Sequence, residues 1–268
     1  MSRALVISGG GCKGAFAIGA IEYLLERFNE WEIIVGTSTG ALIAPLVAGG
    51  KFDLAKEIYS NVKTEDLIKQ YCWLTLPWRS SIYNDKGLRK IIDKNYDERL
   101  HHYLRGSFGA PDVEVCTVNL NSGKICYWSP KDLSREEFCN ALSASSNQPG
   151  FMPPRKIYWN DDEYYVDGGV REIIPIERAI ELGASEITAI VLEPSGVCAV
   201  EGEFDRIPRI MLRSLRLMTV EIREDDIPKG VNLKIIRPDE PLTNNSLRFD
   251  PIEMREMMKR GYEAAKKS

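Results

Sequence analysis

Histidine and paired cysteines are scarce in this sequence of 268 residues. The only histidines are the adjacent His101 and His102, and none of the six cysteines lies at CxxC spacing to another. Such a set offers little material for a zinc site and does not resemble a disulfide scaffold. Apolar runs are also short, and none approaches the roughly 18 residues that a membrane-spanning helix requires. We therefore expect no bound metal and no membrane-spanning helix.

An excess of positive charge and an N-terminal targeting segment are also lacking. Lys and Arg number 35 against 39 Asp and Glu, which gives a formal net charge of −4. Binding to nucleic acid needs a basic field, so we expect no nucleic-acid partner. The first ten residues are typical of a strand that enters a glycine turn rather than of a signal peptide. Together with the cysteine usage, this predicts a cytoplasmic protein.

The composition is that of a soluble globular protein, with 44% hydrophobic and 28% charged residues. A chain of this length can bury about three quarters of its unfolded surface in one core, so folding needs neither a disulfide nor a metal. The sequence has no internal repeat, no low-complexity tract and no obvious linker. We therefore predict a single domain over residues 1–268.

Two short apolar runs near the N-terminus, residues 4–7 and 31–35, each lead into a glycine turn. A helical period follows the first turn over residues 15–28, and a helix of small residues follows the second over 41–48. A repeated order of strand, tight turn and helix is typical of a mainly parallel α/β sheet flanked by helices.

Later segments supply further elements of the same kind of fold. Antiparallel hairpins are predicted at 113–129 and 156–166, strands at 187–192 and 232–236, and helices at 134–144, 176–182, 207–223 and 251–267. The stretch 52–95 is predicted to be helical but irregular. The fold class predicted from these elements is α/β.

A glycine-rich segment joins the first strand to the first helix. It consists of Gly9, Gly10, Gly11, Cys12, Lys13 and Gly14. Glycines let backbone N–H groups approach a ligand, and the helix N-terminus adds a partial positive charge, so the segment predicts an anion site for a phosphate or an oxyanion. Its spacing also satisfies the G-x-G-x-x-G dinucleotide fingerprint. A dinucleotide-binding oxidoreductase is therefore an alternative, although the second strand ends in Gly36-Thr37-Ser38 instead of the expected acidic residue.

The residues from Gly36 to Gly40 spell G-x-S-x-G between a strand and a helix, which is the context of a nucleophile elbow. Ser38 would lie on a strained turn at a helix N-terminus, where a developing negative charge is favoured. The alternative is that Ser38 only caps the helix. An activated serine needs a base, but no histidine follows His102, and both histidines lie in a charged stretch where we expect them at the surface.

A carboxylate is the remaining candidate for the base. Asp167, followed by Gly168 and Gly169, closes the predicted strand at residues 164–166, where another loop could approach. The alternative for this segment is ordinary turn chemistry, because Asp-Gly is a common turn dipeptide.

Taken together, the glycine-rich segment, the G-x-S-x-G segment and Asp167-Gly168-Gly169 resemble the patatin-like phospholipases. Residues 144–153, with small residues followed by Pro and by Phe-x-Pro, are similar to the segment that precedes the aspartate in this family. The resemblance covers about residues 3–190. The helices predicted in residues 203–268 carry no family motif, so their role stays open.

The resemblance implies a three-layer α/β sandwich and a lipid acyl hydrolase of the phospholipase A or lysophospholipase type that needs no cofactor. Carried over, Ser38 is the nucleophile, Asp167 is the general base, and the glycine-rich segment donates N–H groups to the oxyanion. The substrate would be a phospholipid or another fatty-acyl ester. Ser8 and Lys13 depart from the Asp and Arg common in the family, which bears on loop anchoring and headgroup choice. A non-catalytic lipid-binding or interaction protein on the same scaffold is an alternative.

Two segments are candidates for transient contact with a membrane surface. The first is an aromatic stretch that contains Trp73, Leu74, Leu76, Pro77 and Trp78. It could form a lid or an interface anchor, or pack in the ordinary way. The second is a basic face of the predicted helix at 207–223, formed by Arg206, Arg209, Arg213 and Arg216. Such a face can lie on an anionic membrane or simply be solvated.

Overall fold

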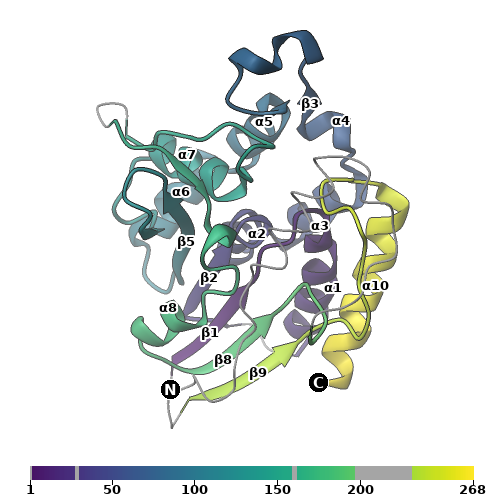
Figure 1. Ribbon diagram of the computed structural model, residues 1–268. Coiled ribbons are helices and arrows are strands. Elements are labelled where there is room, and N and C mark those ends of the chain that lie inside the picture. The colour runs from purple at the N-terminus through teal and green to yellow at the C-terminus, as the bar shows by residue number, and fades with distance from the viewer. Residues whose placement is uncertain (1, 28–29, 159–161, 197–230) are drawn as a thin grey trace.

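The protein is described by a computed structural model over residues 2–27, 30–158, 162–196 and 231–268 (Figure 1). The helix predicted at 207–223 and its four arginines lie outside these residues. The structure consists of a central sheet with helices on both faces, and a small two-stranded sheet at one end.

The central sheet has seven strands in the described chain. They are β1 (Ser2–Ile7), β2 (Ile33–Thr37), β5 (Asp112–Asn119), β6 (Ile125–Trp128), β7 (Tyr165–Asp167), β8 (Ala184–Ile190) and β9 (Asn232–Ile236). The order is β6-β5-β2-β1-β8-β9, and β7 pairs with β5. The pairs β1–β2, β1–β8, β2–β5 and β8–β9 are parallel, whereas β6 and β7 run antiparallel to β5.

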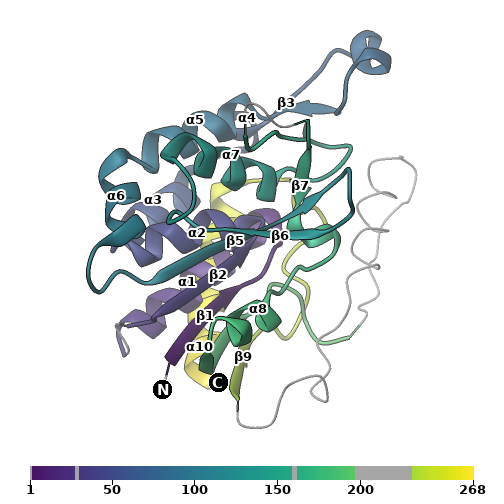
Figure 2. The same cartoon turned by 90° about the vertical axis from the view of Figure 1, so that its left-hand side faces the viewer.

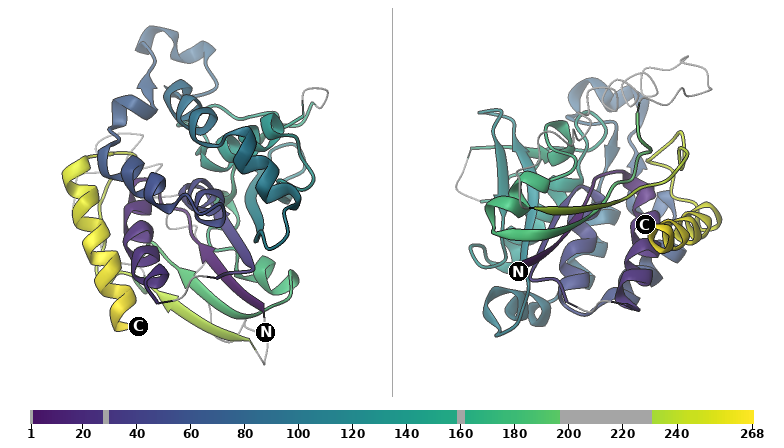
Figure 3. Two further views of the ribbon diagram at one scale, coloured as in Figure 1. Left: turned by 180° about the vertical axis from the view of Figure 1, so that it is seen from behind. Right: turned by 90° about the horizontal axis from the view of Figure 1, so that it is seen from below.

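The helices lie on two faces of this sheet. One face carries α1 (Gly14–Leu25), α2 (Thr39–Ala48), α3 (Phe52–Asn61), α5 (Lys86–Asn95), α6 (Glu98–Gly106), α7 (Arg135–Ser146) and α10 (Pro251–Lys267), and the other carries α8 (Ile176–Glu181). The turn of helix α4 (Thr64–Leu67) precedes the small sheet of β3 (Lys69–Gln70) and β4 (Tyr83–Asn84). Figure 2 and Figure 3 show these layers from other directions.

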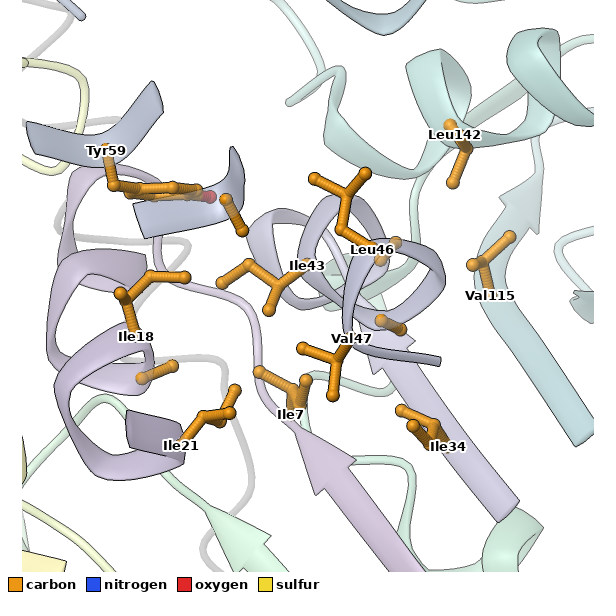
Figure 4. Close-up of a cluster of buried hydrophobic side chains, with 14 of the residues drawn as sticks. Ile7, Ile18, Ile21, Ile34, Ile43, Leu46, Val47, Tyr59, Val115 and Leu142 are labelled. Carbon is orange, nitrogen blue, oxygen red and sulfur yellow. The ribbon is translucent and has the colours of Figure 1, made fainter. Parts of the chain in front are cut away.

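Alternate residues of the central strands point into two different cores. Leu5 and Ile7 of β1 belong to the larger core, beneath α1, α2 and α10, whereas Ala4 and Val6 belong to the smaller core beneath α8. Figure 4 shows part of the larger core, where Ile7 lies near Ile34 of β2 and side chains of α1 and α2. Because both faces are buried, these strands are continuous apolar runs in the sequence. The predicted mainly parallel sheet flanked by helices is confirmed.

The prediction of a hairpin at 156–166 is wrong. Among the described residues of this segment, only Arg155 pairs with Tyr165, as an isolated bridge, and β7 forms its ladder with β5 instead. In the register of this bridge, Pro154 and Pro153 would face Val166 and Asp167, and a proline cannot donate a backbone hydrogen bond to a ladder. The edge of β5 offers β7 a longer ladder.

Glycines on both helices allow the C-terminal helix α10 to pack closely against α1. A Cβ added at Gly19 of α1 would lie 1.8 Å from the carbonyl oxygen of Met258, and one added at Gly261 of α10 would lie 1.9 Å from that of Phe16. Asp250 begins α10 by accepting hydrogen bonds from the backbone N–H groups of Ile252 and Glu253. Helix α10 therefore covers the helix that carries the glycine-rich segment at its N-terminus (Figure 3).

We expect Gly19→Ala to lower the free energy of unfolding by about 1–3 kcal/mol, because the new methyl group overlaps backbone that must move away. The matched control is Gly106→Ala at the end of α6, where an added Cβ has no neighbour within 4 Å and a change within about 0.5 kcal/mol is expected. Denaturant unfolding of the three proteins measures the difference. Equal unfolding midpoints for Gly19→Ala and Gly106→Ala would contradict this prediction, because they would show that α10 can move away from α1 without a loss of stability.

Candidate active site

The end of β2 and the end of β7 meet on one edge of β5. The register pairs β2 with β5 as far as Cys116, and Asp167 of β7 pairs with the next residue, Thr117. Strand β6 also pairs with both of these residues and so occupies the opposite edge of β5. The last residue of β2 and Asp167 therefore face consecutive residues of β5 on the same side. This register brings Ser38 and Asp167 together, although they are 129 positions apart in the chain.

Ser38 lies on a sharp turn between β2 and α2. Its φ angle is 56°, and it is the one non-glycine residue with positive φ in the described chain. The flanking glycines leave no room for side chains, since a Cβ at Gly36 would lie 2.3 Å from the carbonyl oxygen of Gly40, and one at Gly40 would lie 2.1 Å from that of Ile7. These contacts explain both glycines of the G-x-S-x-G pattern, and they hold the serine in a strained conformation.

The hydroxyl of Ser38 is bonded to the carboxylate of Asp167. Its Oγ donates a hydrogen bond to Oδ2 of Asp167 at 2.7 Å, and it makes no capping hydrogen bond to α2. The alternative in which Ser38 only caps the helix is therefore wrong. The other carboxylate oxygen accepts a hydrogen bond from the N–H of Gly169 at 2.7 Å, so Asp167 also has the role in the turn that its sequence indicates.

Asp167 is buried and has a perturbed pKa. Burial raises the pKa of this carboxyl from 3.8 to about 6, while the hydrogen bonds from Ser38 and Gly169 lower it in part. Its ionised form is therefore a stronger base than an ordinary aspartate, yet it still predominates at neutral pH. A hydroxyl paired with such a carboxylate can give up its proton during attack on an electrophile.

Helix α7 also contacts the turn that carries Ser38. The Oγ of Ser145 accepts a hydrogen bond from the N–H of Ser38 at 3.0 Å and donates one to the carbonyl oxygen of Cys116 at 2.6 Å. The hydroxyl of Ser146 donates to the carbonyl oxygen of Ser38 at 3.4 Å. The segment 144–153 was noted in the sequence for its small residues, but nothing in its pattern indicated these contacts.

A buried polar network holds β7 in place. Asp85 accepts hydrogen bonds from Asn147 Nδ2 at 2.8 Å and from Arg155, with which it also forms an ion pair. The carbonyl oxygen of Asn147 accepts from the N–H of Asp167 at 3.1 Å, and Arg155 exchanges backbone hydrogen bonds with Tyr165. Asp85 could not be recognised in the sequence, because a lone carboxylate after a short strand carries no local signal.

The glycine-rich segment passes beside Ser38 and is anchored by later parts of the chain. Gly11 has φ of 59°, and a Cβ there would lie 2.2 Å from the carbonyl oxygen of Ser246. That same oxygen accepts a hydrogen bond from the N–H of Cys12 at 2.9 Å. Ser8 accepts a hydrogen bond on its Oγ from the N–H of Leu192 at 3.0 Å, which shows how the loop is anchored with serine at this position.

Two N–H groups of this segment are available to a ligand. The N–H groups of Gly10 and Gly11 make no hydrogen bond to the described residues, and both glycines line the same cavity as Ser38. The N–H of Gly9, by contrast, donates to the carbonyl oxygen of Ile173. Gly14 lies against α2, since a Cβ there would be 2.4 Å from Thr39 Oγ1. Of the predicted anion-binding residues, Gly10 and Gly11 are therefore best placed to donate.

Lys13 and the remaining predicted glycines have structural contacts. Lys13 is fully buried and forms an ion pair with Glu193. A Cβ at Gly168 would lie 2.6 Å from the carbonyl oxygen of Cys116, so this glycine lets the turn after Asp167 approach β5. Gly169 donates to Asp167 as described above.

Ser38 and Asp167 open into an apolar cavity of about 180 Å³. Its walls come mainly from α2, α3, α4 and α5, and they include Leu46, Tyr59, Leu67, Ile68, Leu88 and Ile92. Apolar walls with a few convergent polar groups at one end are typical of a site for a largely hydrophobic ligand.

The two histidines lie apart from this cavity. His102 is exposed as predicted, but the prediction for His101 is wrong, because its side chain is buried and its Nδ1 is hydrogen-bonded to the hydroxyl of Tyr96 at 3.0 Å. Leu100, His101 and Leu104 are the buried residues of α6, so His101 lies on the face of this helix that packs against the core. In the described ranges, no cluster of three or more His, Cys, Asp or Glu could hold a metal ion. No helix within these ranges is both long enough and apolar enough to cross a membrane.

The amino-acid sequence of this chain is similar to a known family of proteins. Residues 5–180 match the family model described as patatin-like phospholipase. The chain is 28% identical over 192 residues to the uncharacterized protein YqhO of Bacillus subtilis, which covers 64% of each chain. It is 25% identical over 190 residues to the probable lipid hydrolase 463L of Invertebrate iridescent virus 6, which covers 67% of this chain and 63% of the relative.

The chain thus spans less than two thirds of either relative. Among solved structures, VipD from Legionella pneumophila has a similar fold, with a TM-score of 0.56 at 14% identity. That similarity covers 99% of this chain and 66% of VipD. At this identity the structural match bears on the fold alone.

Proposed function

The chain belongs to the patatin-like phospholipase family, and on this basis we propose that it is a lipid acyl hydrolase with Ser38 as nucleophile and Asp167 as general base. The observation that carries the proposal is the 2.7 Å hydrogen bond from Ser38 Oγ to Asp167, two residues that line an apolar cavity. The substrate would be a phospholipid or another fatty-acyl ester, with its acyl chain in the cavity.

In the first half of the proposed reaction, Ser38 Oγ attacks the ester carbonyl carbon while its proton moves to the Asp167 carboxylate. The negative charge that develops on the carbonyl oxygen is stabilised by the N–H groups of Gly10 and Gly11 and by the N-terminus of α2. The bond to the leaving alcohol then breaks, and the alcohol takes the proton from Asp167. The acyl group is left on Ser38 as an ester.

In the second half, water attacks the acyl-enzyme and gives its proton to Asp167. Collapse of the second tetrahedral intermediate releases the fatty acid, and Ser38 recovers its proton. Each step uses only groups of this chain, the ester and water. Oxyanion donors contribute strongly in such reactions, since the loss of one typically costs about 100- to 1,000-fold in rate.

We also propose that residues 1–268 act as one domain. The family match ends at residue 180, but β8 and β9 continue the same sheet, and the carbonyl oxygen of Ser246 holds the glycine-rich segment. Residues beyond the family match would then be needed for the shape of the site. A cytoplasmic location is proposed from the sequence features alone.

The proposal is tested by labelling with a fluorophosphonate probe and mapping the modified peptide. We expect label on Ser38, loss of label in Ser38→Ala, and unchanged labelling in Ser80→Ala, whose serine is exposed and far from α2 in the chain. A panel of phospholipids, lysophospholipids and neutral esters then identifies the substrate. A folded protein that leaves Ser38 unlabelled would favour a non-catalytic lipid-binding protein on the same scaffold.

A further inference from the structure

An aromatic arm stands out from the body of the protein. The arm, residues 69–84, consists of β3, the 3₁₀ helix η2 (Trp73–Trp78) and β4. Figure 1 and Figure 2 show it projecting beyond α4 and α5. None of the six residues of η2 is buried, so its side chains belong to no core.

The short helix η2 of the arm exposes three large apolar side chains within six residues. Trp73 is 73% exposed, Leu74 is 58% exposed and Trp78 is 83% exposed. Ordinary packing, the alternative considered for this segment, is therefore wrong for these three residues. A contiguous exposed apolar patch marks a site of interaction, and tryptophan has an apolar body with a polar N–H that suits the interface between lipid and water.

The charge of the arm is entirely positive. Residues 69–84 contain Lys69 and Arg79 but no Asp or Glu, in a chain whose net charge is −4. Both cations are exposed, and the guanidinium of Arg79 lies 4.5 Å from the ring centroid of Tyr71. An apolar tip flanked by cations complements a bilayer, whose surface presents anionic headgroups above an apolar interior.

The base of the arm is continuous with the wall of the cavity. Leu67 and Ile68 line the cavity and lead directly into β3. On the return side, the N–H groups of Ile82 and Tyr83 donate to the carbonyl oxygens of Gly150 and Phe151, in the loop that also contributes Gln148 and Met152 to the cavity. A partner that binds the arm would therefore lie close to the cavity wall formed by Leu67, Ile68 and Met152.

We propose that the arm anchors the protein to a phospholipid bilayer, with Trp73, Leu74 and Trp78 in the interfacial region and Lys69 and Arg79 among anionic headgroups. Binding through the arm needs no catalysis. That the bilayer also supplies the ester to the cavity rests on the proposed hydrolase function.

The test measures sedimentation of the full chain with vesicles of phosphatidylcholine and phosphatidylglycerol in equal parts, in the Ser38→Ala background so that no lipid is consumed. The double variant W73S/W78S is expected to bind about tenfold or more weakly, because the buried apolar area is lost. The matched control is F108S, which removes an even more exposed aromatic residue from the loop between α6 and β5 and should bind as the parent does.

A second pair of variants tests the charge. K69Q and R79Q should each weaken binding to the mixed vesicles about fivefold and leave binding to pure phosphatidylcholine unchanged. Equal binding of W73S/W78S and its parent, with both proteins folded by circular dichroism, would overturn the proposal. So would a tryptophan-dependent dimer of the parent in light scattering without lipid, because the patch would then be covered by a second copy. Since turnover is not measured, these results do not depend on whether Ser38 is the nucleophile.

Discussion

Replacing Ser38 by alanine is expected to lower the hydrolysis of a p-nitrophenyl ester by at least about 1,000-fold, because Ser38 is the hydroxyl that is hydrogen-bonded to the proposed base, Asp167. The substitution removes one oxygen and leaves Gly36 and Gly40 with their close backbone contacts, so the turn should keep its shape. The measurement is kcat/KM for the soluble ester, together with the far-ultraviolet circular dichroism of both proteins.

The control for this experiment is Ser80→Ala, which removes an exposed hydroxyl from the arm and should hydrolyse the soluble ester as the wild type does. A Ser38→Ala protein as active as the wild type would end the proposed mechanism. A Ser38→Ala protein that has lost its circular dichroism signal would instead call for Ser38→Cys, which keeps a nucleophile of similar size and should retain measurable acylation.

Replacing Asp167 by asparagine is expected to lower the same rate by about 100- to 10,000-fold, since the proton of Ser38 then has no base to receive it. The wild-type enzyme should show the role of this base in its pH profile. Because burial raises the pKa of Asp167 to about 6, kcat/KM should fall about tenfold for each pH unit below 6 and be level above it. A profile that is flat from pH 5 to pH 8 would contradict a role for Asp167 as the base.

The same raised pKa predicts that lowering the pH from 6 to 4, which lowers the rate, raises the contribution of Asp167 to the free energy of unfolding. The folded-state pKa of Asp167 lies above its ordinary value of 3.8, so between about pH 4 and pH 6 the folded protein binds more protons than the unfolded chain. The destabilising contribution of Asp167 is therefore fully present above about pH 6 and is relieved as the pH falls toward 4. Asp167→Asn should gain about 1–3 kcal/mol relative to the wild type at pH 7.5 and much less at pH 4.5. Urea unfolding at the two pH values measures this difference.

Much of the site could be predicted from the sequence, because its main features are local. The elbow at Ser38 follows from a strand, two glycines and a helix within a dozen residues, and the structure gives the steric reason for Gly36 and Gly40. The parallel strands were recognisable because burial on both faces makes them continuous apolar runs. Helix α10 was recognisable from its periodicity, with Asp250 and Pro251 at its start.

Other features could not be predicted, because they depend on contacts between distant segments. The pairing of Ser38 with Asp167 was expected only through the family resemblance, because their hydrogen bond depends on the register of β2 and β7 along β5, which no local pattern encodes. The role of Ser246 in holding Gly11 and Cys12 likewise appears only when the C-terminal part of the chain packs on α1. Burial of His101 could not be predicted from its charged neighbours Glu98 and Arg99, which are exposed, because His101 shares the buried face of α6 with Leu100 and Leu104.

The sequence by itself determined the α/β fold class, the family and the strained turn at Ser38, since backbone sterics and apolar periodicity act over a few residues. The tertiary structure alone decided the contact between Asp167 and that serine, the burial that raises the pKa of Asp167, and the place of the cavity. It also decided that Trp73 and Trp78 remain outside the core. The physical reason is that burial, strand register and close contact between helices depend on which distant segments pack together. A single segment could pack against many others, and only the folded chain selects among them.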